Sequence, residues 1–238
     1  MLKVENTEVL GWEHAIRGLR NPMNSWDKSD SYYGCCGEKC EDCCHQEKCG
    51  KSYFEYHIGS NDLDLMKRLI KAGSDHSKFM RMITVYVDVT APLYWFKEFD
   101  TYKVGTVANS CSTMHKIHAK EFTLDDFSCE HLIDNLSECD GISFEDGINT
   151  PKEILLLIID TLNTYRHWFL ETKDKKYWYQ MIQLLPSSYN QKRTLQLNYA
   201  VLRNMYHSRK NHKLDEWHTF CEWIESLPYS ELITMEGE

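Results

Sequence analysis

Apolar side chains recur along the chain mainly at helical spacing, with a few short stretches of two-residue alternation. Residues 10–19 carry apolar side chains at positions that share one face of a short helix. A second helix begins at Asn61 or Asp62, either of which is a favourable N-cap, and it ends at Gly73. The pattern therefore predicts two helices in the first third of the chain.

Two segments have the composition of strands. Residues 53–58 form a short strand, and residues 79–89 are β-branched and aromatic with two-residue alternation. Ala91-Pro92 then opens an aromatic helix, because proline is tolerated in a first helical turn. We expect residues 79–89 to be the clearest strand of a small sheet.

The longest helix is predicted over residues 150–172. Thr150 is a favourable N-cap, Pro151 suits the first helical position, and Glu153 completes a capping box. Three further helices are predicted over residues 175–185, 191–208 and 215–227. Together these elements predict an α+β fold in one domain, 1–238, with a small, mostly antiparallel sheet packed with several helices.

Composition narrows the class of protein. The 238 residues are 42% hydrophobic and 13% aromatic, which is enough to bury a core, and the formal charge is −9. Because duplex nucleic acid is bound through neutralised phosphates, this charge argues against that partner. No apolar run reaches about 18 residues, and residues 1–12 do not resemble a targeting peptide, so we expect a cytoplasmic protein without a membrane span.

The cysteines are unevenly distributed. Six of the ten lie within residues 35–49, inside a segment, 34–50, that is rich in glycine, cysteine and charge and that we interpret as an inserted loop. Thiolates two to four residues apart can converge on one tetrahedral zinc ion; an iron–sulfur cluster and a loop without metal are the alternatives. The candidate metal ligands are Cys36, Cys40, Cys43, Cys44 and Cys49.

Polar residues interrupt the predicted helix over residues 191–208. Asn198 and Arg209 share a face with apolar side chains, which suits a binding surface. The alternative is that Arg209 pairs with a carboxylate at the helix end, where a cation suits the helix dipole. Lys192 and Arg193 are either solvated cations or ligand-binding ones.

Residues 104–113 are small and rich in hydroxyl groups, and they lie between well-formed elements. Such a loop lets backbone N–H groups approach an anion, or it is a Ser/Thr-rich structural turn. Cys111 with His115 nearby is a weaker candidate for a nucleophile, because no third group that would orient the histidine is in view.

The order of segments resembles the flavin-dependent thymidylate synthases, the ThyX family. The similarity covers residues 62–114 and 177–217, with the turn Gly73-Ser74-Asp75-His76 before the strand and Ala91-Pro92 after it. Downstream, Leu185-Pro186 followed by Asn198, Asn204 and Arg209 is similar to the family's Leu-Pro…Asn…Asn…Arg spacing.

The resemblance implies a homotetramer that binds FAD and a pyrimidine nucleotide such as dUMP. The residues that it assigns to flavin are His76, Tyr102, Lys103, Asn198 and Asn204. Those assigned to the nucleotide are Asn109, Lys192, Arg193 and Arg209, with Arg209 and Ser112 as the catalytic candidates.

The chain departs from the family signature R-H-R-x-x-S-x-N-x-x-S-x-R. Thr101 and Tyr102 stand at its first arginine and its histidine, and Lys103 keeps only the positive charge of its second arginine. A shift of one residue recovers Asn109 and Ser112 but no final arginine. Because threonine has neither the charge nor the fork geometry of arginine, phosphate and flavin are held differently or not at all.

Two classes of function follow. As an enzyme, the chain would reduce FAD with NADPH and methylate dUMP to dTMP with methylene-tetrahydrofolate, as the family does. As a binding protein, it would keep the fold and sequester or sense a nucleotide, or it would act as an accessory protein assembled through a zinc-stabilised arm, because fold alone does not fix function.

Overall fold

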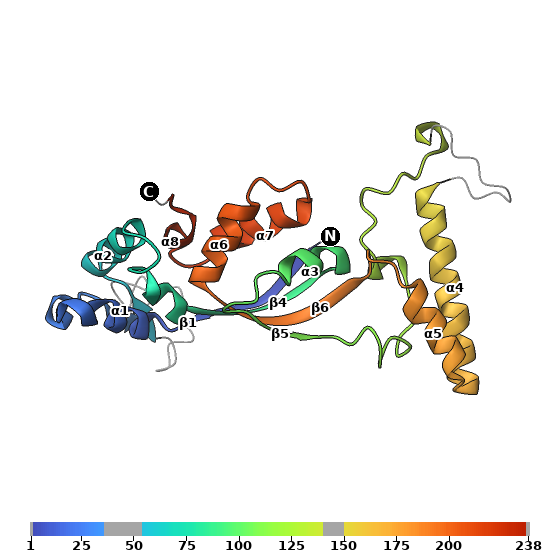
Figure 1. Ribbon diagram of the computed structural model, residues 1–238, viewed down its shortest axis with the longest axis horizontal. Helices are drawn as coiled ribbons and strands as arrows, with labels where there is room; N and C mark the ends of the chain where they lie inside the picture. Colours follow the sequence, from blue (N-terminus) through green and yellow to red (C-terminus); the bar gives the residue numbers. More distant parts are fainter. Residues whose placement is uncertain (1, 36–53, 140–149, 237–238) are drawn as a thin grey trace. The chain divides into compact units, whose positions relative to one another are not determined.

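The computed structural model describes residues 2–35, 54–139 and 150–236, and these form two compact units (Figure 1). The described residues of unit 1 are 2–5, 88–102, 108–139 and 150–195. Those of unit 2 are 6–35, 54–87, 103–107 and 196–236. Each unit is built from segments that are far apart in the sequence.

The fold is α+β with a small antiparallel sheet, as the sequence predicted. Four strands lie in the order β1 (Lys3–Leu10), β4 (Thr84–Pro92), β6 (Asn190–Asn198) and β5 (Val107–Ser110). A separate antiparallel pair, β2 (Tyr32–Cys35) and β3 (Phe54–His57), places Tyr32 opposite His57. The strand predicted over residues 53–58 is confirmed by β3.

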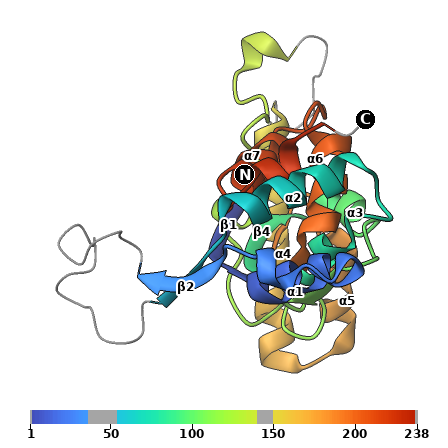
Figure 2. The same cartoon turned by 90° about the vertical axis from the view of Figure 1, so that its left-hand side faces the viewer.

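Unit 2 carries the helices of both ends of the chain. They are α1 (Trp12–Arg20), α2 (Ser60–Lys71), α6 (Tyr199–Arg209), α7 (Asp215–Glu225) and α8 (Glu231–Thr234), with the 3₁₀ turns η1 (Asn21–Met23), η2 (Trp26–Lys28) and η4 (Lys78–Met82). Helix α6 packs against α7, α8 and η4, and Figure 2 shows α6 beside α7. The predicted first, second and last helices are thus present, each within a few residues of its expected ends.

Unit 1 contains α3 (Leu93–Phe99), the 3₁₀ turns η5 (Leu124–Asp126) and η6 (Leu136–Glu138), and a helical hairpin of α4 (Pro151–Thr172) and α5 (Lys175–Leu184) (Figure 1). The capping box at α4 is confirmed: Thr150 accepts from the Glu153 backbone N–H at 3.2 Å, and the Glu153 carboxylate accepts from the Thr150 N–H at 3.0 Å. The hairpin has a core of its own, made by Ile117, Phe122, Phe127, Leu155, Ile159, Leu162 and Met181.

No helix within residues 2–35, 54–139 and 150–236 combines the length and the apolar character that crossing a bilayer requires.

Three expectations need correction. The helix predicted over residues 191–208 is wrong in its first half, because residues 190–198 form strand β6 and α6 begins at Tyr199. The strand predicted over residues 79–89 begins as the 3₁₀ turn η4, and its extended part is β4. Residues 107–110, expected to be loop, pair as strand β5 at the end of the sheet order.

The predicted cap of α2 is also wrong. Asp62 lies inside the helix and is fully buried, whereas the carboxylate of Asp30 accepts from the backbone N–H groups of Asn61 at 2.9 Å and Asp62 at 3.1 Å. A residue from a different segment therefore satisfies the first N–H groups of α2, which a local sequence motif cannot reveal.

Asp62 is the centre of a buried polar network in unit 2. One of its oxygens accepts from Arg20 Nε at 2.6 Å, and the other accepts from the hydroxyls of Ser29 and Ser31, each at 2.6 Å. Burial alone would raise the pKa of Asp62, but the hydrogen bonds from both serines and from Arg20 outweigh it and hold that pKa below its ordinary value. The network joins α1, residues 29–31 and α2.

We predict that Asp62→Asn lowers the free energy of unfolding by about 3–5 kcal/mol, because it leaves the buried Arg20 without its counter-charge. Since the pKa of Asp62 is lower in the folded state, its contribution is complete above the unfolded pKa and disappears as the pH falls through the folded value. Urea unfolding at pH 7 and at pH 3 measures both effects.

The matched control is Asp64→Asn on the same helix. Asp64 pairs with Arg68 at 3.0 Å with both side chains about two-thirds exposed, so its loss changes stability by about 0.5 kcal/mol or less. Equal effects of the two substitutions would contradict the role of the buried network.

Candidate functional site

The residues predicted for the site fall into two groups, one in each unit. Unit 1 holds Tyr102, Asn109, Ser112, Lys192 and Arg193, and unit 2 holds His76, Lys103, Asn198, Asn204 and Arg209. The five cysteines proposed as metal ligands (Cys36, Cys40, Cys43, Cys44 and Cys49) lie outside the described residues. Within residues 2–35, 54–139 and 150–236, no cluster of His, Cys, Asp and Glu could hold a metal ion.

In unit 2, Asn198 stands at the junction where β6 ends and α6 begins. Its side-chain oxygen accepts from the backbone N–H of Val201 at 3.0 Å, which caps α6, and its amide nitrogen donates to the carbonyl oxygen of Gly105 at 3.4 Å. The expected position inside a helix is wrong, because Asn198 is the N-cap of α6 and contacts the loop at residues 103–107. The contact with flavin that the resemblance implies stays a prediction.

Glycine is needed at position 105. Its φ of +84° lies in the left-handed region, and a Cβ there would lie 2.6 Å from the amide nitrogen of Asn198. The close approach of backbone and amide therefore depends on the absence of a side chain. The sequence contained a signal for this in its lone glycine within a polar loop, but it gave no indication of the partner.

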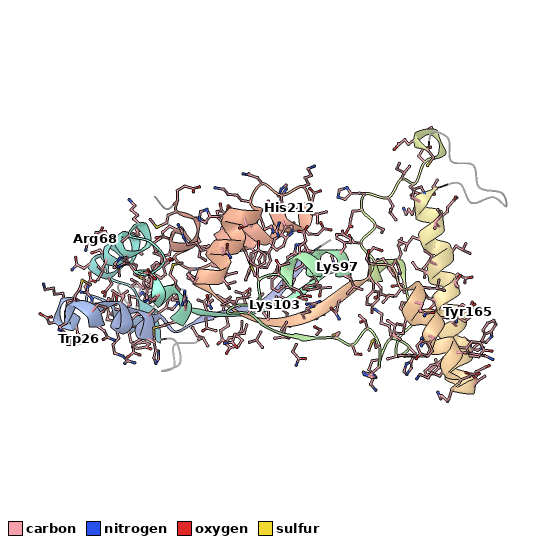
Figure 3. All side chains as sticks on the ribbon, viewed as in Figure 1. Trp26, Arg68, Lys97, Lys103, Tyr165 and His212 are labelled. Atoms are coloured by element: carbon pink, nitrogen blue, oxygen red, sulfur yellow. The ribbon has the colours of Figure 1, made fainter. Side chains whose placement is uncertain are left out.

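The same loop offers donors to an anion. Lys103, which is labelled in Figure 3, is exposed, and it has no ion-pair partner among the residues that the structure describes. The hydroxyl oxygen of Thr106 is buried and has no hydrogen-bond partner in that same part of the chain. An ammonium group and an unused hydroxyl close together in sequence are suited to a phosphate.

The other predicted residues of unit 2 differ in exposure and in contacts. The guanidinium carbon of Arg209, the last residue of α6, lies 5.2 Å from the ring centre of the buried Trp217. Asn204 is exposed and accepts from the hydroxyl of Ser208 at 3.5 Å, and His76 is exposed in the turn after α2. Arg209 is thus held against an aromatic ring, which restricts its motion and leaves its charge in place.

In unit 1, Lys192 is surrounded by carboxylates. It lies on β6, 3.2 Å from an oxygen of Asp88 on β4 and 3.6 Å from an oxygen of Glu5 on β1. The hydrogen bond that Lys192 donates to Asp88, together with the charges of both carboxylates, raises the pKa of Lys192. Asp88 also accepts from the hydroxyl of Thr194 at 2.6 Å, so the carboxylate is fixed beside the lysine.

Arg193 points to the opposite face of β6, because successive strand residues alternate. It donates to Asp100 at 2.7 Å and to the side-chain oxygen of Gln191 at 2.9 Å, and its guanidinium carbon lies 3.8 Å from the ring centre of Phe96. Both predicted phosphate-binding cations of β6 are therefore neutralised by carboxylates that sequence reasoning did not identify.

The end of the predicted anion loop is fastened to β6. The Cys111 N–H donates to the Lys192 carbonyl at 2.9 Å, and the Gln191 amide donates to the Cys111 carbonyl at 2.7 Å. The hydroxyl oxygen of Ser112 accepts from the backbone N–H groups of Met114 and His115, two and three residues further along the turn. Ser112 is thus part of a turn.

Asn109 and Tyr102 complete the group in unit 1. Asn109 is exposed on β5, whose four residues are all exposed, whereas Tyr102 is half-buried after α3. The backbone N–H of Tyr102 donates to the carbonyl of Phe99 at 3.0 Å, which extends the end of that helix.

We predict that Gly105→Ala lowers stability more than Gly73→Ala does. Both glycines have positive φ, +84° and +104°, so both substitutions incur backbone strain of about 1–3 kcal/mol. Only at position 105 does the new methyl group also meet another atom, the Asn198 amide, whereas nothing lies within 4 Å at position 73. Urea unfolding of both variants measures the difference, and equal losses would contradict the proposed contact.

No family model and no curated protein matches the chain in sequence. Solved structures match it along its length. A structure of flavin-dependent thymidylate synthase ThyX from Helicobacter pylori, complexed with FAD and dUMP, aligns with a TM-score of 0.62 at 15% identity and covers 98% of each chain. A second structure of that enzyme with FAD and dUMP gives a TM-score of 0.63 at 15% identity, over 99% of this chain and 98% of the other.

A UMP/dUMP methylase, PolB from Streptomyces cacaoi, bound with 5-Br dUMP, aligns with a TM-score of 0.57 at 12% identity, over 100% of this chain and 96% of the other. At these identities the likeness concerns the fold. The chain therefore has the fold of ThyX and of the PolB methylase.

Proposed function

We propose that the chain binds a flavin and a pyrimidine nucleotide, and that it methylates the nucleotide as a ThyX-like enzyme. The observation that carries the proposal is the likeness in fold, over 98% or more of this chain, to structures that hold FAD and dUMP or a dUMP analogue. The proposed substrate is dUMP, with methylene-tetrahydrofolate as the one-carbon donor and NADPH as the reductant.

The residues of unit 2 fit an anionic cofactor. Lys103 supplies a cation, the hydroxyl of Thr106 is an unused donor, and the contact between Gly105 and Asn198 holds the loop in one conformation. Side-chain amides such as that of the exposed Asn204 can donate to and accept from a flavin ring edge. We therefore assign a phosphate of FAD or of the nucleotide to the loop at 103–107.

When bound, the flavin supplies the redox chemistry. The chain's own residues would then bind and orient. Lys103 and Arg209 would supply positive charge to anionic ligand groups, and the stacking of Arg209 on Trp217 would fix the direction in which its guanidinium points. Ser112 remains a catalytic candidate from the sequence, although its oxygen already accepts two backbone hydrogen bonds.

A non-catalytic nucleotide-binding protein is the second candidate, and a specific observation favours it. Lys192 and Arg193 are both paired with carboxylates, and Thr101, at the position of a signature arginine, donates its hydroxyl to the Glu98 carbonyl at 2.7 Å. A site with fewer available cations holds phosphate more weakly, which suits sensing better than turnover.

The test begins with the purified full chain. Bound oxidised flavin gives a yellow protein that absorbs at about 450 nm, which is a property of the cofactor itself. Enzyme function predicts that dUMP stimulates NADPH oxidation and that dTMP forms when methylene-tetrahydrofolate is supplied. Nucleotide binding without dTMP supports the second candidate, and a chain that takes up neither FAD nor dUMP contradicts both.

The Lys103→Gln variant locates the binding site. A charge-assisted hydrogen bond to phosphate contributes about 1.5–3 kcal/mol, so we expect the Kd for FAD or for dUMP to rise by about tenfold or more. Lys71→Gln removes an exposed lysine of the same unit and is the matched control. Equal affinities in the two variants would exclude Lys103 from the site.

Two further expectations from the sequence belong to this proposal. We expect the chain to assemble as a homotetramer, which light scattering of the full chain measures. We also expect the cysteine segment to bind zinc, and metal analysis after anaerobic purification would show about one zinc per chain.

A further inference from the structure

A cluster of cations and aromatic rings lies at the closed end of the α4–α5 hairpin in unit 1. Residues 165–179 contain six aromatic side chains, and Tyr165 of this segment is labelled in Figure 3. We define the hairpin patch as the cations Lys116, Arg166, Lys173 and Lys175 with the rings of Trp178 and Tyr179. None of these residues has been given a role in flavin or mononucleotide binding above.

The patch is assembled by specific contacts between the hairpin and the segment before it. Arg166 Nε donates to the His118 carbonyl at 3.0 Å, and the indole N–H of Trp178 donates to the Met114 carbonyl at 2.9 Å. Lys116 lies between the two accepting residues, so these bonds keep its backbone beside the hairpin. Lys175 lies over the rings of Trp178 and Tyr179, and it thereby joins the patch through the same indole that contacts Met114.

The positive charge of the patch is not neutralised locally. Within residues 2–35, 54–139 and 150–236, no carboxylate forms an ion pair with any of its four cations, whereas nearby Lys176 and Lys120 pair with Asp174 and Asp126. The pKa of His118 is lowered by burial and then by the charges of Lys116, Lys173 and Arg166. These three cations therefore all lie near His118. On a chain of charge −9, this is a local concentration of positive charge.

The rings of the patch are accessible and carry cations close to their faces. Tyr179 is 44% exposed, and Trp178 is half-buried at 4.9 Å from it, ring centre to ring centre. The ammonium group of Lys175 lies 5.2 Å from the Tyr179 ring and 6.0 Å from the Trp178 ring. Trp178 packs partly against the hairpin core, whereas Tyr179 is not among the residues of that core.

We propose that the hairpin patch binds single-stranded nucleic acid, with bases stacked on Tyr179 and Trp178 and phosphates held by the four cations. Flat rings interleaved with unpaired cations are the arrangement that single strands favour, because every base has a face to stack and every linkage carries a charge. A duplex keeps its bases stacked on one another, and an overall charge of −9 opposes its long array of phosphates.

The proposal is tested by fluorescence anisotropy of labelled 12-mers of deoxythymidylate and uridylate with the full chain. We expect binding at 50 mM salt, with log K falling against log[salt] at a slope of about −3, since each of four phosphate contacts contributes about −0.7 for a single strand. A duplex of the same length is expected to compete poorly.

Two variants and two controls locate the binding surface. We expect Tyr179→Ala to weaken oligonucleotide binding about tenfold, and Lys116→Gln with Lys175→Gln to weaken it and to reduce the salt slope by about half. The controls change exposed residues of unit 2. Tyr32→Ala matches the loss of one ring, and the double variant Lys71→Gln with Lys78→Gln matches the loss of two positive charges. Binding of FAD and dUMP is expected to be unchanged in the patch variants. This proposal, which does not rest on the proposed function, is therefore tested separately from it.

Three results would overturn the proposal. The first is no oligonucleotide binding at 50 mM salt, and the second is equal weakening in the patch variants and their controls. The third is that the patch variants lose binding to phosphatidylserine vesicles or lose self-association while the affinity for the oligonucleotide stays the same.

Discussion

The candidate site of unit 2 depends on the two hydrogen bonds that the side-chain amide of Asn198 makes. One side chain caps α6 and also fastens the backbone of residues 103–107 through Gly105. The next residue secures the junction, since the Tyr199 N–H donates to the Ile83 carbonyl at 3.1 Å and its buried ring lies 5.1 Å from that of Trp12. The loop that carries Lys103 is therefore anchored to the end of β6.

Ion pairs with carboxylates determine which cations of the chain are available to a ligand. On β6, Lys192 and Arg193 have acidic partners from neighbouring elements, whereas Lys103 has none among the residues that the structure describes. A phosphate that approached Lys192 would have to replace Asp88, which Thr194 also holds. Lys103 thus keeps an exposed charge, whereas the hydroxyl of Thr101 donates to the Glu98 carbonyl.

Local signals in the sequence predicted much of the fold. Thr150, Pro151 and Glu153 determine the start of α4 within four residues, so this helix was predicted correctly. The helix predicted over residues 191–208 is wrong in its first half, because the buried Leu195 and Leu197 follow the two-residue alternation of a strand. Asn198 is the cap of α6 and not a residue of its interior. The carboxylate beside Lys192 was not predictable, because Asp88 comes next to it only when β4 and β6 pair. The same holds for the capping of α2 by Asp30.

The hypothesis that the loop at residues 103–107 holds a ligand phosphate can be tested by hydrogen–deuterium exchange of the full chain with and without FAD and dUMP. Bound phosphate would use the donors of the loop and would tighten its contact with Asn198. We expect slower exchange at residues 103–107 and in the first turn of α6 when both ligands are present. Unchanged exchange in both segments, under conditions in which the ligands are shown to bind, would contradict the assignment.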